Sequence, residues 1–158
     1  MPDGTVYILT GPVQSGKTTS LIQWAAKRTD VYGILTPVVS GKRVFMNAQS
    51  KEQFSMEADD GETATIPVGR FIFSKAGFDR AIQIIRAALN LPGWLVIDEA
   101  GPLELRGEGF YDALKEILQE RKEKIILVVR KGLAEEVQRY FAFNATRLMN
   151  PGELFSLQ

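Results

Sequence analysis

Residues 11–18 read Gly11-Pro12-Val13-Gln14-Ser15-Gly16-Lys17-Thr18 and match the phosphate-binding pattern G-x-x-x-x-G-K-[ST]. The apolar run Thr5 to Leu9 before them predicts a strand, and Leu21, Ala25 and Arg28 recur after them at helical spacing. A glycine loop between a strand and a helix turns backbone N–H groups and the positive end of the helix toward an anion. The segment therefore predicts a cradle for the phosphates of a nucleotide.

The residue types of this loop have separate roles in that geometry. Gly11 and Gly16 let the backbone approach the phosphates closely, and Lys17 reaches the β- and γ-phosphates. The hydroxyl of Thr18 is expected to coordinate Mg²⁺. Lys17 counts both as a nucleotide-binding residue and as a catalytic one. The expected nucleotide-binding residues are Gly11, Pro12, Val13, Gln14, Ser15, Gly16, Lys17, Thr18 and Thr19.

A second motif is the apolar run Leu95 to Ile97, which predicts a buried strand and ends in the adjacent carboxylates Asp98 and Glu99. Asp98 is expected to hold Mg²⁺ through a water, because this small cation keeps several waters and accepts few protein carboxylates. Glu99 lies one residue further and is expected to orient or deprotonate an attacking water. The sequence thus predicts Mg²⁺ as the cofactor, with Thr18 and Asp98 as its protein ligands.

The rest of the chain alternates between helical and strand patterns. Apolar residues recur at helical spacing over 78–89, 110–118 and 133–141, and 125–129 is a second continuously apolar run. Such alternation predicts a mainly parallel central sheet between layers of helices, joined by right-handed crossovers. The predicted fold class is α/β, a three-layer sandwich of the P-loop NTPase type, in a single domain over residues 1–158.

Residues Val38 to Phe73 break this alternation and are predicted to form an antiparallel insertion. Apolar side chains alternate with polar ones around Met46 and again around Met56, as on half-buried strands. Asn47 to Ser50 is expected to join these two strands as a hairpin. A further strand is predicted from Arg70 to Phe73.

Composition narrows the chemistry further. The 158 residues include 19 basic and 19 acidic side chains, and neither Cys nor His. Balanced charge indicates no nucleic-acid partner, and the lack of Cys and His excludes thiol nucleophiles, Ser-His triads and the usual zinc sites. The apolar runs are far shorter than the roughly 20 residues of a membrane span. Met1-Pro2-Asp3-Gly4 does not resemble a signal peptide, so we expect a cytoplasmic protein that does not enter a membrane.

Phosphoryl transfer also needs a cation that offsets the charge on the transferred group. Arg130 is the first candidate, because it directly follows the buried strand 125–129. Ligands of open α/β sheets bind outside the carboxyl ends of the strands, where this residue is expected. Arg43, within the insertion, is the second candidate.

The chain resembles a family of P-loop nucleoside-triphosphatases that has thermophilic bacterial and human members. Its most specific match is Asp98-Glu99-Ala100-Gly101-Pro102-Leu103-Glu104-Leu105, which resembles the extended motif D-E-hydrophobic-G-x-(M/L)-E-L of that family. Further similar segments are Gly33-Ile34-Leu35-Thr36, Gly41-Lys42-Arg43 and Gly69-Arg70-Phe71. The family often has an acid and an arginine where this chain has Val38 and Val39.

The resemblance implies Mg²⁺-dependent, broadly base-tolerant hydrolysis of nucleoside triphosphates to diphosphates, in a P-loop domain with an antiparallel insertion. The family motif includes the glutamate that matches Glu104 but does not assign its chemistry. Glu104 is therefore either a partner in a hydrogen-bond network or a catalyst.

Hydrolysis, with Glu99 positioning the water, is the leading functional hypothesis, and two others stay open. One is a kinase that passes the γ-phosphoryl group to a small metabolite beside the insertion, which requires an acceptor pocket that excludes water. The other is a binding module whose nucleotide occupancy orders the insertion and recruits a protein partner of unknown identity.

Overall fold

The computed structural model describes residues 5–12 and 15–157 of the chain. The strands are β1 (Val6–Gly11), β2 (Val31–Leu35), β3 (Val38–Val39), β4 (Lys42–Asn47), β5 (Gln53–Ser55), β6 (Thr65–Val68), β7 (Phe71–Ser74), β8 (Trp94–Ala100), β9 (Lys124–Arg130) and β10 (Arg147–Met149). The helices are α1 (Lys17–Ala26), α2 (Lys75–Ala87), α3 (Tyr111–Glu120) and α4 (Ala134–Tyr140), with the 3-10 helices η1 (Glu104–Arg106) and η2 (Pro151–Ser156). Among the described helices, none has the length and apolar character needed to cross a bilayer.

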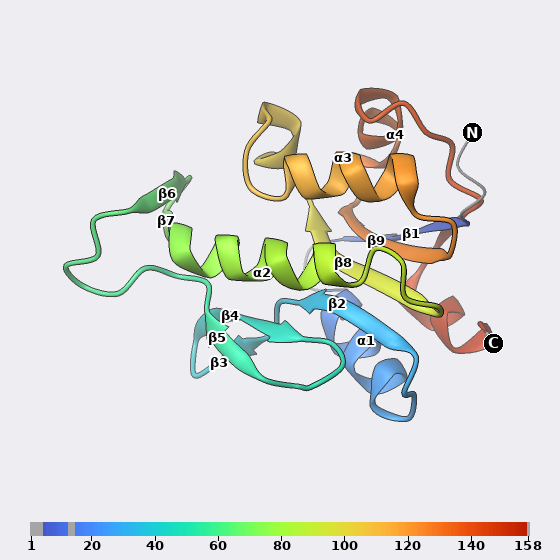
Figure 1. The fold of residues 1–158 in the computed structure, drawn as a ribbon, viewed down its shortest axis with the longest axis horizontal. Coiled ribbons are helices and arrows are strands. Elements are labelled where there is room, and N and C mark those ends of the chain that lie inside the picture. The colour runs from blue at the N-terminus through green and yellow to red at the C-terminus, as the bar shows by residue number, and fades with distance from the viewer. Residues whose placement is uncertain (1–4, 13–14, 158) are drawn as a thin grey trace.

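The central sheet has the strand order β10-β1-β9-β8-β2-β4-β3, with β5 also paired to β4 (Figure 1). All pairings from β10 to β2 are parallel. The predicted α/β class with a mainly parallel sheet and an antiparallel insertion is confirmed.

Alternate residues of the buried strands face two separate cores, as the pleat of a strand requires. On β8, Leu95 and Ile97 pack in the core formed with α2, α3 and α4. Trp94 and Val96 pack in the core formed with α1 and η2. Helices therefore cover both faces of the sheet, which explains the continuous apolar runs of its central strands.

The strand order brings three chemically important strand ends to one edge. Strand β9 lies between β1 and β8, and its last residue, Arg130, is paired with Gly11 of the phosphate loop. On the other side of β9, Asp98 is paired with Val128. Parallel strands end at the same edge, so the glycine loop, the carboxylates and Arg130 all lie there.

The antiparallel insertion forms two separate pieces. Strand β4 pairs antiparallel with β2, β3 and β5 and so extends the central sheet. Strands β6 and β7 form a hairpin of their own. The sequence predicted a strand from Arg70 to Phe73, corresponding to β7, and missed β6. Pro67 lies within β6, and proline lacks the N–H that a paired strand donates, so it is confined to edge strands such as this one.

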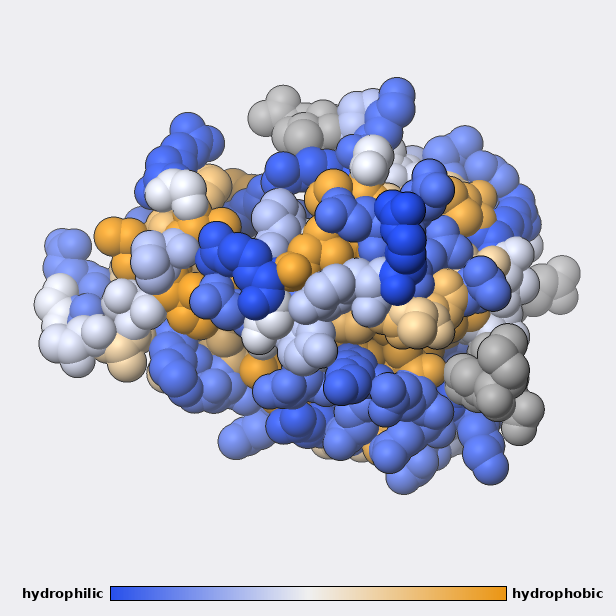
Figure 2. All heavy atoms as spheres, turned by 90° about the horizontal axis from the view of Figure 1, so that it is seen from above, coloured by the Kyte–Doolittle hydropathy of each residue, from blue (hydrophilic) through white to orange (hydrophobic). Residues whose placement is uncertain are grey.

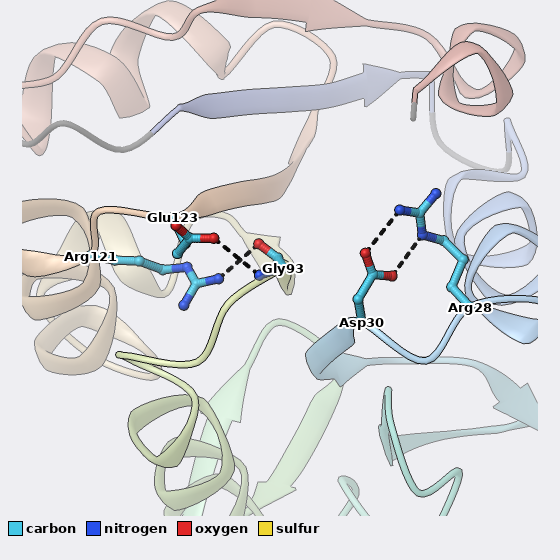
Figure 3. Close-up of polar contacts among 5 residues, drawn as sticks. All are labelled: Arg28, Asp30, Gly93, Arg121 and Glu123. Atoms are coloured by element: carbon cyan, nitrogen blue, oxygen red, sulfur yellow. Dashed lines mark hydrogen bonds and ion pairs between the residues drawn. The ribbon is translucent and has the colours of Figure 1, made fainter.

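At the opposite edge of the sheet, the buried guanidinium of Arg121 joins the loops that lead into β8 and β9. Figure 3 shows Arg121 directed at Gly93, whose carbonyl accepts from Nη2 at 3.0 Å. The Gly93 N–H in turn donates to Glu123. The other carbonyls that accept from Arg121 are those of Ala88, Leu89, Leu91 and Lys124. Arg121 thus satisfies carbonyls that the end of α2 and the following loop leave without helical partners.

A second polar contact holds the start of β2 at the same edge. Arg28 and Asp30 form a two-pronged ion pair at 2.9 and 3.0 Å, also drawn in Figure 3. The carbonyl of Asp30 accepts from the N–H of Trp94 at 2.8 Å. Arg121 and the Arg28–Asp30 pair therefore stabilise the edge of the sheet opposite the carboxyl edge, where the predicted site residues lie.

Candidate active site

The phosphate loop is built as the sequence predicts wherever the structure describes it. Gly16 has a φ of 83°, in the left-handed region that favours glycine, and the next residue, Lys17, begins α1. The ammonium of Lys17 donates to the carbonyls of Gly11 and Pro12, each at 3.0 Å, and so reaches back across the loop. Val13 and Gln14, both predicted to bind nucleotide, lie outside the described residues.

The start of α1 is suited to an anion. Its first turn contains no acidic residue, and among the described residues no side chain caps its first N–H groups. These donors and the helix dipole therefore stay available to a phosphate. Ser15, Thr18 and Thr19 line the cleft above this helix end together with Lys17.

Asp98 joins the carboxylate strand to the phosphate loop. Its Oδ2 accepts from the hydroxyl of Thr18 at 2.7 Å and from the N–H of Thr36 at 3.1 Å. The side chain is only 2% exposed, and burial raises the pKa of Asp98 although both hydrogen bonds favour its charged form. The sequence did not assign a role to Thr36, whose only signal was its place at the end of the family-like segment Gly33-Ile34-Leu35-Thr36, directly after β2.

The oxygens of Thr18 and Asp98 fit a small hard cation. A hydroxyl and a carboxylate held at hydrogen-bonding distance are the ligand types that Mg²⁺ takes from proteins. In the part of the chain that the structure describes, no group of three or more His, Cys, Asp or Glu residues lies close enough to enclose a metal. Mg²⁺ needs no such cage, since it completes its octahedron with water and substrate phosphates.

Glu99 occupies a bulge at the end of β8. Asp98 is paired with Val128 and Ala100 with Val129, so Glu99 is an extra residue between two consecutive partners. A bulge redirects side chains, and here the adjacent carboxylates of Asp98 and Glu99 both face the cleft. Burial raises the pKa of Glu99, and the charge of Asp98 raises it further.

Basic side chains surround Glu99 and act in the opposite direction on its pKa. The charges of Arg43, Arg130 and Lys17 each lower that pKa. Both arginines proposed from the sequence therefore lie near the same carboxylate, although they come from β4 and β9. Arg70 lines the cleft as well, although the sequence predicted no site role for it. Its guanidinium lies 5.0 Å from the centre of the Phe71 ring, and that of Arg43 lies 5.9 Å from it.

These residues enclose a cleft of about 770 Å³ at the carboxyl edge of the sheet. It is lined by the phosphate loop and the start of α1, by residues of β3 and β4, by Arg70 and Phe71 where β7 begins, and by the ends of β8 and β9. Its volume falls within the range of small-molecule sites. The structure therefore brings every described site residue predicted from sequence to a single cavity or to the loop that borders it.

Glu104 lies deeper, in η1, and is 4% exposed. Its two carboxylate oxygens accept from the N–H groups of Gly101 at 2.9 Å and Phe110 at 3.0 Å. Burial outweighs these hydrogen bonds and raises the pKa of Glu104 to about 7. The carboxyl group thus fixes the loop between β8 and α3, as expected of a network partner.

Sequence comparison finds similar proteins of one kind. A family model described as NTPase matches residues 6–150. The chain is 30% identical over 137 residues to nucleoside-triphosphatase THEP1 of Thermococcus kodakarensis, a match that covers 78% of this chain and 75% of the relative. It is 40% identical over 65 residues to nucleoside-triphosphatase THEP1 of Pyrococcus abyssi, covering 40% of this chain and 36% of the relative.

Solved structures share the fold over nearly the whole chain. THEP1 from Aquifex aeolicus superposes with a TM-score of 0.71 at 18% identity, covering 98% of this chain and 97% of its own. A human cancer-related nucleoside triphosphatase superposes with a TM-score of 0.66 at 22% identity, covering 96% and 94%. At these identities the likeness concerns the fold alone.

Proposed function

Because this chain belongs to the NTPase family and is a nucleoside-triphosphatase, we propose that its cleft hydrolyses nucleoside triphosphates in a Mg²⁺-dependent reaction that tolerates different bases. The observation that carries the proposal is the 2.7 Å hydrogen bond between Thr18 and Asp98. It joins the end of the phosphate loop to the carboxylate strand, and these are the two places from which P-loop enzymes hold their metal.

Thr18 and Asp98 would hold Mg²⁺, with Asp98 acting through a water. When bound, the cation neutralises charge on the β- and γ-phosphate oxygens. The protein is expected to supply the remaining charge. Lys17 reaches forward from its carbonyl partners to the phosphates, and Arg130 offsets charge on the transferred phosphoryl group. Arg43 is the alternative to Arg130, since it lines the same cleft.

Glu99 is proposed to accept the proton of the attacking water. As the water oxygen bonds to the γ-phosphorus, the bond from that phosphorus to the bridging oxygen breaks, and the diphosphate leaves with its electrons. Its raised pKa brings Glu99 closer to the operating pH, and a general base works best when its pKa lies near that pH. The bulge supports this role, because it directs Glu99 into the cleft next to Asp98.

Broad base tolerance is supported by the chemistry of the outer cleft. Beyond the phosphate loop, the cleft is lined by the apolar side chains of Ile22, Pro37, Val38 and Phe71, beside the polar Gln23, Thr36, Arg43 and Arg70. Apolar groups contact the face of any base without reading its hydrogen-bonding edge, so they discriminate little. Val38 is 65% exposed and lines the cleft, so its side chain is available to contact a base.

The direct test is phosphate release from ATP, GTP, CTP and UTP, each with and without Mg²⁺, by the wild type and by Lys17→Ala. We expect release from all four with Mg²⁺ and loss in the variant, since Lys17 binds the phosphates that are cleaved. Undiminished release in the presence of a chelator would rule out the Mg²⁺ dependence. Release from one nucleotide alone would rule out the base tolerance.

A further inference from the structure

A second cavity, of about 300 Å³, adjoins the cleft on the side away from the phosphate loop. Asp98, Glu99 and Arg130 line both cavities, whereas the loop residues 15–19 line the cleft alone. The second cavity therefore opens next to the proposed base. Its volume lies at the lower end of the range of small-molecule sites, whereas hydrolysis needs room for a single water beside the phosphates.

The inner wall of this cavity is apolar. It is formed by Met56, Phe73, Phe78, Leu103 and Phe110, which come from segments far apart in the sequence. Phe71 stacks on Phe73 with the ring centres 5.7 Å apart and the planes at 8°. An apolar wall neither binds nor orients a water, but it does accept the body of a small organic molecule.

The β6–β7 hairpin lines one side of the cavity through Val68, Phe71 and Phe73. It is held to the preceding segment by hydrogen bonds from Ala58 to Ile72 and from Ser74 to Met56, each 2.8 Å. Figure 2 shows apolar surface at the end of the molecule that carries this hairpin. An apolar pocket beside the reacting centre, with one wall made by a hydrogen-bonded hairpin, can hold the body of a phosphoryl acceptor where water would otherwise lie.

The charged groups restrict what can enter. Of the described charged residues that line the second cavity, Glu104 is the one that does not also line the cleft, and its oxygens accept from backbone N–H groups. Among these described residues, no cationic side chain lies on that side to bind an anion. Arg43, Arg70 and Arg130 lie on the side shared with the cleft, where the phosphoryl group is expected. These charges favour a neutral compound that enters unphosphorylated and becomes anionic beside the arginines.

We propose that this cavity binds a small neutral alcohol with an aromatic or branched apolar body, and that the enzyme transfers the γ-phosphoryl group to it. The alcohol oxygen bonds to the γ-phosphorus, the bond to the bridging oxygen breaks with its electrons on the diphosphate, and the hydroxyl proton passes to Glu99. The products are a phosphate monoester and the nucleoside diphosphate. This activity rests on the nucleotide site proposed above.

The test follows ³¹P resonances while the enzyme turns over ATP with benzyl alcohol, 2-phenylethanol or 3-methylbutanol. The methyl ether of 2-phenylethanol is the control, since it has the same body and no proton to transfer. We expect monoester from the alcohols and inorganic phosphate alone with the ether. Inorganic phosphate alone with all three alcohols overturns the proposal. Absence of phosphate even without any alcohol would instead contradict the proposed hydrolysis.

Variants of the hairpin test the location. Val68 lines the cavity, and Val68→Trp fills it. Ile72→Trp is the matched control, because Ile72 is 57% exposed and lies between Phe71 and Phe73, which face the cavity from the same strand. We expect Val68→Trp to lower monoester formation more than about tenfold with hydrolysis retained, since displacing a fitted apolar group costs at least this much. Val68→Phe repeats the test if Val68→Trp does not fold. Equal monoester formation by Val68→Trp or Val68→Phe and by Ile72→Trp would overturn the assignment.

Discussion

The hydroxyl of Thr18 donates a 2.7 Å hydrogen bond to Oδ2 of Asp98, a residue 80 positions further along the chain. Thr18 lies in α1, which follows β1, and Asp98 lies in β8; in the sheet, β9 separates β1 from β8. Since Asp98 is buried, this contact and the N–H of Thr36 fix its carboxylate toward the phosphate loop.

Thr18→Val keeps the shape of the side chain and removes its hydroxyl. We expect turnover to fall by at least about 10- to 100-fold, the loss seen when only a partner of a metal ligand is removed, because Thr18 is itself a proposed ligand. The Mg²⁺ concentration for half-maximal activity should also rise. Thr18→Ser, which keeps the hydroxyl, is the control and should stay near the wild type. Steady-state phosphate release over a Mg²⁺ titration measures both effects. Wild-type activity in Thr18→Val would remove this residue from the proposed metal site.

Glu99→Gln removes the proposed base and keeps the side chain's size. Turnover should fall by about 10²- to 10⁴-fold, the usual contribution of general base catalysis, with nucleotide affinity nearly unchanged. Single-turnover kinetics and fluorescent nucleotide binding separate the two quantities. Glu120→Gln, at the exposed end of α3, is a control with the same chemical change. A loss of nucleotide binding equal to the loss of turnover would contradict the assigned role.

Arg130→Ala and Arg43→Ala distinguish the two proposed cations. We expect Arg130→Ala to lower kcat by about 10²- to 10³-fold with little change in KM, because charge on the transferred group develops in the transition state. Arg43→Ala should change kcat less, and Arg139→Ala on α4 is the control. The opposite ranking of Arg130→Ala and Arg43→Ala would transfer the role to Arg43.

Glu104 should make the protein less stable as pH rises. Its pKa is 4.5 when unperturbed and about 7 in the fold, so between these values the native state binds more protons than the unfolded state. The free energy of unfolding therefore falls by about 3 kcal/mol from pH 4.5 to pH 7 on account of this group.

The measurement for Glu104 is urea unfolding of the wild type and Glu104→Gln at pH values between 4.5 and 8. The glutamine keeps the shape and cannot titrate, but it has a single accepting oxygen and so cannot accept from both Gly101 and Phe110. We expect the wild type to be the more stable protein at low pH and to lose that advantage as pH rises. A stability difference between the two proteins that stays constant across this pH range would refute the raised pKa of Glu104.

Arg121→Met should destabilise the fold without altering the site. It removes the guanidinium donors of the Leu91 and Gly93 carbonyls and one of the two donors of the Ala88 carbonyl, for which we expect a loss of about 3 kcal/mol. Arg28→Met removes a partly exposed ion pair with Asp30 and should cost less than about 1 kcal/mol. Urea denaturation measures both. Equal losses would mean that the carbonyl contacts of Arg121 contribute little.

Several features could be predicted from the sequence because a short stretch encodes each one. The phosphate loop needs only its own glycines and the strand and helix beside it, and the β8 carboxylates follow a run of apolar residues. The 3-10 helix η2 was also encoded locally and was missed. Asn150 and Glu153 form a reciprocal cap with Pro151 at the start, a recognisable signal for a helix start. The assignment of residues 1–158 to one domain and the roles of the site residues stay predictions.

The tertiary structure alone decided which distant groups meet. No local pattern places Thr36 on Asp98, or Arg43, Arg70 and Arg130 around one cleft, because these contacts depend on the order of the strands. Strand β6 and the second cavity have the same origin, since both form only where the hairpin packs over segments distant in sequence. Local backbone preferences and hydrophobic periodicity determined the motifs and the α/β class, while long-range pairing and burial determined the site's neighbours.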